Sequence, residues 1–131
     1  MAQAAIAALD RWVRDGTPPP TAGRLGTAPG EPARLHLDEL GIATGGVRSP
    51  WVDVPAAVLS GLGQEASPGP AFLFGSTRPL AAGTLRRLYP AGADDYVPAF
   101  RAAAEQMADA GFLLAEDLEE AVAVAFASFP E

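Results

Sequence analysis

Residues 16–33, GTPPPTAGRLGTAPGEPA, limit the possible folds more than any other part of the chain. Proline fixes its own φ angle and lacks an amide donor, and glycine adds backbone freedom, so this segment favours neither a helix nor a central strand. An unstructured connection of this length is uncommon inside a compact domain unless it lies along a partner surface. We therefore predict an irregular surface segment here.

A helix is predicted before this segment, over residues 2–15. Ile6, Leu9 and Val13 fall on one helical stripe, and Trp12 widens it. Gly16 and the three prolines after Thr17 end the helix. The result is an amphipathic helix with large apolar side chains on one face.

The last fifty residues predict three further helices. The first covers residues 80–89 with Leu80, Leu85 and Leu88 facing inward, and Pro90 ends it. The second starts near Asp94 or Asp95, places Pro98 in its first turn and runs to Ala110, before Gly111. The expected inner face of this second helix consists of Val97, Phe100, Ala104 and Met107. The expected inner face of the third helix consists of Leu118, Val122, Ala125 and Phe129. These two helices predict an antiparallel hairpin.

Between these helical parts, only short strands are predicted. The candidates are residues 34–40, the WVDVPAAVL stretch within residues 47–60, and residues 71–75. Pro55 excludes the second from a central position in a sheet. The fold class is therefore mainly α with a few short strands (α+β). We divide the single segment 1–131 into the helix over 2–15, an irregular region over 16–79 and a helical C-terminal subdomain over 80–131.

The charge of the chain argues against several classes of partner. The formal net charge is −7, and residues 102–131 carry seven acidic side chains and no basic one. A nucleic acid or an anionic membrane surface requires basic side chains, so neither partner is expected. We interpret the acidic stretch as the solvated face of the last helices.

The side chains available for metal binding and catalysis are also limited. The chain has no cysteine and one histidine, which excludes disulfides and thiolate chemistry and leaves only carboxylates for a metal. No cofactor or metal is predicted. The absence of cysteine fits a reducing cytoplasm, and the N-terminus is too amphipathic for a signal peptide.

Ser60 is the first candidate nucleophile, because it lies in a small-residue context, V-L-S-G-L-G. The elbow of a serine hydrolase requires G-x-S-x-G, and Val58 occupies the position of the first glycine. Ser76 also fails this pattern, and His36 precedes both serines, whereas the catalytic histidine of that fold follows its nucleophile. We predict no catalytic residue in this chain. A strand or turn role is expected for Ser60, and a solvent-facing role or a pairing with Asp38 for His36.

The stretch GGVRSPWVDVP, residues 45–55, places two charges among apolar residues. If partly buried, Arg48 and Asp53 should pair, because an unpaired buried charge is costly. We therefore predict a structural ion pair between them. An alternative is that Arg48 and Trp51, together with Phe74, line the wall of a substrate cleft.

Several stretches resemble the C-terminal part of the bacterial alpha/beta hydrolase domain-containing proteins, in the same order and over nearly the whole chain. They are ALDRWVRDGTPPP (8–20), GGVRSPWVDVPAAVLSGLGQ (45–64), FLFGSTRPL (72–80), LRRLYP (85–90), DDYVPAFRAAAEQMADAGFLL (94–114) and the AEDLEEAV that follows. In that family the nucleophile elbow, the acid and the catalytic histidine lie upstream of the helix that residues 2–15 resemble. The resemblance therefore gives no catalytic residue in this chain.

The resemblance implies a C-terminal segment of a serine hydrolase of esterase type, which forms packing surface or a cleft wall and is catalytically incomplete alone. The uncapped start of the first helix supports the expectation that a further segment normally precedes it. The implied partner is the rest of a hydrolase domain, in the same chain or in another, and exposed apolar surface around Ile6, Leu9 and Trp12 with self-association is expected without it. The alternative is a non-enzymatic acidic helical interaction module.

Overall fold

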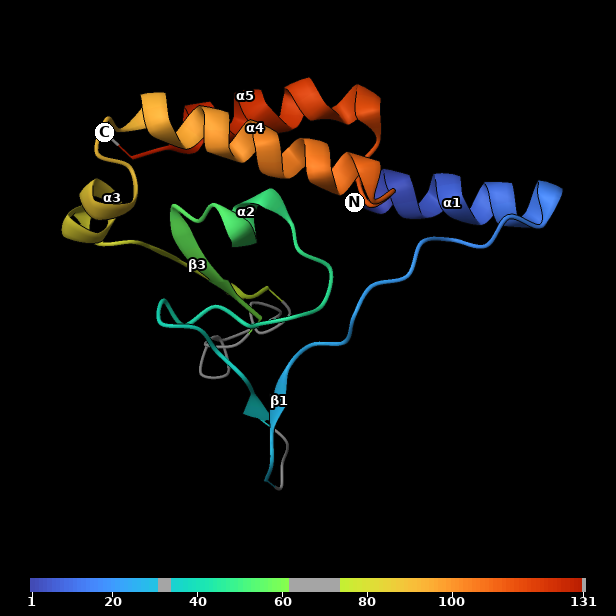
Figure 1. Cartoon of the computed structure of the whole chain (residues 1–131), viewed down its shortest axis with the longest axis horizontal. Helices are drawn as coiled ribbons and strands as arrows, with labels where there is room; N and C mark the ends of the chain where they lie inside the picture. Colours follow the sequence, from blue (N-terminus) through green and yellow to red (C-terminus); the bar gives the residue numbers. More distant parts are fainter. Residues whose placement is uncertain (31–33, 62–73, 131) are drawn as a thin grey trace.

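The C-terminal part of the chain forms an antiparallel pair of helices (Figure 1). In this computed structural model, which describes residues 1–30, 34–61 and 74–130, helix α4 covers Ala93–Asp109 and α5 covers Leu118–Ser128. A turn at Gly111, with φ of 80°, and the short 3₁₀ helix η2, Ala115–Asp117, connect them. Only glycine adopts such a φ without strain, so Gly111 ends α4 as expected.

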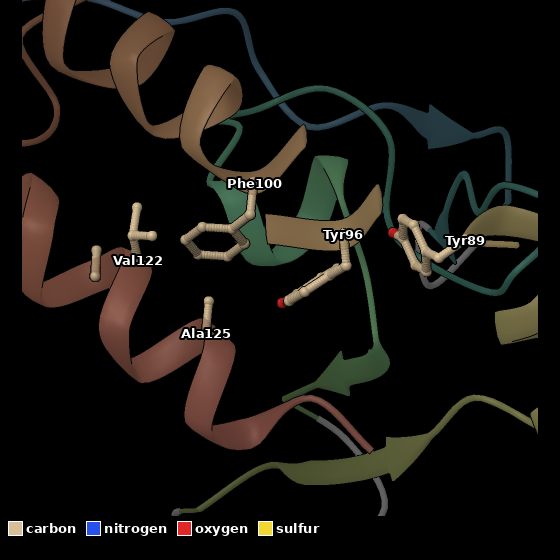
Figure 2. Close-up of a cluster of buried hydrophobic side chains, with 6 residues drawn as sticks. Tyr89, Tyr96, Phe100, Val122 and Ala125 are labelled. Atoms are coloured by element: carbon tan, nitrogen blue, oxygen red, sulfur yellow. The ribbon is translucent and has the colours of Figure 1, made fainter. Parts of the chain in front are cut away.

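The core of the molecule lies between this hairpin and the segments beneath it. Phe100 and Ala125 are fully buried, and Tyr96, Val122 and Tyr89 nearly so; Figure 2 shows the group. The aromatic rings meet mostly edge to face: Tyr89 and Tyr96 have centroids 5.2 Å apart and planes at 78°. This arrangement suits the ring quadrupoles and adds to the burial energy. A mainly α fold with an antiparallel hairpin is therefore confirmed.

Two details of the helical part differ from the prediction. Helix α3, Ala82–Leu88, leaves Leu88 exposed and buries Tyr89 just after its end. The backbone leaves the helix at Tyr89, so the next side chain, and not Leu88, turns inward. Pro98 lies in the second turn of α4, because the helix starts at Ala93 and not at Asp94 or Asp95. The Asp95 carboxylate still serves the helix start by accepting a hydrogen bond from the Ala91 amide at 2.6 Å.

The strands within the described residues form two antiparallel pairs. Strand β1, Thr27–Ala28, pairs with β2, Arg34–Leu35, and β3, Ala57–Ser60, pairs with β4, Ser76–Pro79. The prediction over 34–40 was too long, because only its first two residues belong to a strand. The prediction over 71–75 lies mostly outside the described residues, and β4 begins just after it.

The stretch WVDVPAAVL was predicted as one extended segment, and this was wrong for its first half. Pro50–Asp53 forms a short helix, α2, and only Ala57–Ser60 is a strand. Pro50 occupies the first helical position after Ser49, where a fixed φ favours a helix and no amide hydrogen is needed. Pro55 then separates the helix from the strand.

Helix α1, Ala2–Asp15, has the predicted bounds and ends at Gly16 with φ of 77°. The N-terminus lies beside the end of the hairpin and α1 extends away from it, while the chain after Gly16 returns toward β1 (Figure 1). Ala4 and Ala8 are the buried residues of this helix. No helix among the described residues is both long and apolar enough to cross a membrane.

Candidate functional site

Helix α2 positions most of the residues that the sequence points to. It packs against α4 on one side and lies next to β3. Pro50 is fully buried and anchors the helix, while Trp51 and Asp53 leave it in different directions, toward different pockets. Four residues of helix, fixed by a proline at the start and another just after the end, thus hold two functional candidates in place.

Arg48 and Asp53 form an ion pair across the start of α2. Arg48 Nε donates to Asp53 Oδ1 at 2.7 Å, and a terminal nitrogen of the same guanidinium lies 2.6 Å from that oxygen. Another nitrogen of Arg48 donates to the Ala43 carbonyl at 2.9 Å. The guanidinium therefore ties the loop at Ala43 to α2, which is the structural role considered for this pair. Both side chains stay about a third or more exposed, so the pair is partly solvated.

Trp51 contributes to a different feature, a pocket of about 200 Å³ between the β3–β4 pair and the hairpin. Its ring meets Phe100 edge to face, with centroids 4.9 Å apart. Arg48 instead borders a separate pocket of about 180 Å³ with Gln106 and Met107. Phe74 is 69% exposed and borders neither pocket. The structure therefore does not bring the three cleft candidates together, and a cleft role for each stays a prediction.

The serine and histidine candidates lie on different elements. His36 follows β2, and its Nδ1 is 3.1 Å from Thr44 Oγ1, so its contact is with a threonine and not with Asp38. Asp38 instead accepts hydrogen bonds from the amides of Leu40 and Ile42. Ser60 ends β3, opposite Ser76 on β4. Over the ranges that the structure describes, no group of three His, Cys, Asp or Glu side chains is arranged to hold a metal ion.

Two buried tyrosines near the α2 region were missed by the sequence analysis. Tyr89 donates a hydrogen bond from its hydroxyl to the Pro55 carbonyl at 3.2 Å, which ties the end of α3 to the loop before β3. Burial raises the pKa of Tyr89 to about 12, and the electrostatic effect of the neighbouring Tyr96 contributes a smaller part of this rise. Burial also raises the pKa of Tyr96. Tyr96 precedes Phe100 by four residues, so extending the stripe of Phe100 backwards by one turn would have found it.

Comparison with known proteins gives one match. The family model described as "Alpha/beta hydrolase domain" matches residues 1–123. No curated protein and no solved structure matches the chain. The family match covers α1, both strand pairs, α2, α3, α4 and about half of α5. The chain therefore belongs to the alpha/beta hydrolase domain family.

Proposed function

We propose that this chain is a C-terminal, non-catalytic part of a serine hydrolase of esterase type. It packs on the rest of the hydrolase domain through α1 and contributes packing surface or a cleft wall. The nucleophile, acid and histidine belong to that other part. The family match supports the hydrolase assignment, and the lack of a G-x-S-x-G sequence in this chain supports the division of roles.

The exposed apolar face of α1 is the main support for this proposal. The residues of α1 that are buried are alanines, Ala4 and Ala8. Its large apolar residues are between 51% and 78% exposed; they are Ile6, Leu9, Trp12 and Val13. Soluble domains rarely leave such a contiguous apolar group in water, and a group of this kind marks a contact surface. The exposed surface expected around Ile6, Leu9 and Trp12 is thus present.

The surroundings of α1 also fit a docking surface. A groove of about 530 Å³ runs along the helix, and its walls are almost entirely apolar; they include Leu9, Trp12, Pro20, Val47 and Phe112. Part of the Pro-rich segment therefore forms one wall of this groove. A hydrolase core presents an apolar face where helices cover its sheet, so its chemistry complements this groove. The acidic residues of the hairpin lie on other elements, which favours this surface over the acidic interaction module.

The docking test uses the 131-residue chain and charged substitutions in α1. The double variant Leu9→Glu/Trp12→Glu should reduce the binding of an apolar dye and the self-association of the chain, because it places charges on the exposed face. The matched control is Val124→Glu, since Val124 is 51% exposed on α5, a different helix. Equal dye binding and equal self-association in the α1 variant and the control would contradict the docking role.

The catalytic part of the proposal is tested with a serine-reactive phosphonate and a short-chain nitrophenyl ester. The chain alone should show neither labelling nor turnover. When a hydrolase segment that carries the elbow and the histidine is added, or expressed in the same chain, labelling should appear on that segment. Labelling of Ser60 together with turnover that is lost in Ser60→Ala would overturn the proposal. If neither the same coding region nor a neighbouring gene encodes such a segment, the interaction module is favoured.

A further inference from the structure

The pocket beside Trp51 has a size and lining that suit a small ligand. Its volume is about 200 Å³, and it lies between β3, β4 and the end of α5. Most of the wall is apolar, from Trp51, Ala56, Ala57, Leu59 and Pro79. An engineered apolar cavity of about 150 Å³ in another protein stays dry and binds benzene, so this volume holds a ring-sized molecule.

One buried polar group in the wall, the hydroxyl of Tyr96, has no hydrogen-bond partner among the described residues. Tyr96 is only 2% exposed, and its ring is held by Phe129, stacked at 4.5 Å, and by Phe100 and Tyr89. Its hydroxyl points toward α5 and away from Tyr89 (Figure 2), and it makes no hydrogen bond to the described residues. Leaving a buried hydroxyl without a partner is costly, so such groups in native proteins are rare and usually have a reason.

The pocket is the space that this hydroxyl reaches. Among the described residues, no fully enclosed side-chain oxygen or nitrogen lacks a partner, so the Tyr96 oxygen must touch space large enough for a water molecule. Tyr96 lines the pocket. Two other residues of the wall carry a hydroxyl. That of Ser128 already donates to the Ala125 carbonyl at 3.2 Å, and Thr77 is an exposed residue of β4. Burial raises the pKa of Tyr96, so its hydroxyl stays protonated and available as a donor at neutral pH.

We propose that this pocket binds a small, uncharged, mostly apolar molecule that presents one hydrogen-bond acceptor, such as a ketone or ester carbonyl, to the Tyr96 hydroxyl. The apolar walls exclude a charged ligand, because none of its lining residues carries a charge to pair with it. The ring of Trp51 and the side chains of β3 and β4 contact the apolar body of the ligand. This site is a property of the chain itself and does not depend on the hydrolase assignment.

The test compares acetophenone with ethylbenzene, which has a similar shape and no acceptor. Binding to the 131-residue chain is followed by the NMR signal of the Trp51 indole N–H, and both probes should shift it in a saturable way. Tyr96→Phe should weaken acetophenone about three- to tenfold, the value of one net hydrogen bond, and leave ethylbenzene unchanged. Ala57→Leu should abolish binding of both probes, because the larger side chain fills the pocket.

Tyr89→Phe is the matched control, because Tyr89 is also buried but its hydroxyl is already paired with the Pro55 carbonyl. This variant should bind acetophenone like the wild type. The proposal is overturned if neither probe binds the folded chain in a saturable way, or if the pocket holds water that acetophenone does not displace. It is also overturned if Tyr96→Phe weakens both probes equally, or if Ala57→Leu, still folded by circular dichroism, binds them as before.

Discussion

Helix α1 and helix α4 of the hairpin both have amphipathic sequences, and they use them in opposite ways. In α4 the large side chains are buried, as Tyr96, Phe100 and Met107 show. In α1 the alanines are buried and the large side chains, such as Leu9 and Val13, remain in water. The comparison teaches that an apolar stripe predicts a contact surface, but does not say whether the contact lies within the same chain.

The largest expected effect comes from truncating one large side chain in each region. Phe100→Ala should lower the free energy of unfolding by about 3–5 kcal/mol, because it opens a cavity in the core. Leu9→Ala should change it by less than about 0.5 kcal/mol, since Leu9 is 54% exposed in this chain. Urea unfolding followed by circular dichroism measures both. Similar losses in the two variants would break the comparison.

A second prediction is that in α1 enlarging a buried alanine lowers stability more than truncating an exposed leucine. Ala8→Leu should destabilise the chain by about 1–3 kcal/mol, because Ala8 is only 2% exposed and a larger side chain overpacks its surroundings. Its control is Ala5→Leu, at an exposed position of the same helix, where little change is expected. Thermal unfolding should show that Ala8→Leu lowers the stability of the chain more than Leu9→Ala does. This result would support the contrast between α1 and the hairpin. A neutral Ala8→Leu would show that α1 does not pack as described.

The smallest expected effect concerns Tyr89, in the core of the hairpin region, and includes a change in stability at alkaline pH. The pKa of Tyr89 is raised from 10 to about 12 in the folded state, so between pH 10 and 12 the unfolded chain releases its proton first. The stability from this group is complete below pH 10 and is lost as pH rises toward 12. Tyr89→Phe should cost about 1 kcal/mol at neutral pH, through the lost hydrogen bond to Pro55, and should flatten this alkaline decline.

Stability is measured by urea unfolding at pH 7 and at steps between pH 10 and 12. Part of the loss of stability at alkaline pH should remain in the Tyr89→Phe variant, because burial also raises the pKa of Tyr96. A decline of the same steepness in the wild type and in Tyr89→Phe would contradict the assignment of this group. The N-terminal helix has no buried titratable residue, so changes in α1 should leave the alkaline decline as it is.

The sequence predicted the helices better than the segments between them. The ends of α1 and α4 follow from Gly16 and Gly111, because a glycine with a left-handed φ ends a helix locally. Residues 50–60 were harder, because Val and Trp favour an extended segment while Pro50 after Ser49 starts a helix. The burial of Tyr89 in place of Leu88 depends on where the chain leaves α3, which periodicity alone does not give.

The candidate site shows the same division. The charges of Arg48 and Asp53, close in sequence and set among apolar residues, sufficed to predict their pairing, which the structure shows as a direct ion pair. The pocket around Trp51 could not be predicted, because its walls come from α2, β3, β4, α4 and the end of α5. Tyr96 borders it only because the hairpin lies against the β3–β4 pair.

By itself, the sequence determined the helical stripes, the irregular Pro- and Gly-rich segment, the absence of a nucleophile elbow and the family resemblance. Each of these depends on neighbouring residues or on fixed backbone preferences, which act locally. Only the tertiary structure decided that α1 keeps its large side chains exposed while α4 buries its own, and that Tyr96 lines a small apolar pocket. Those outcomes depend on which surfaces meet, and packing between distant segments sets that.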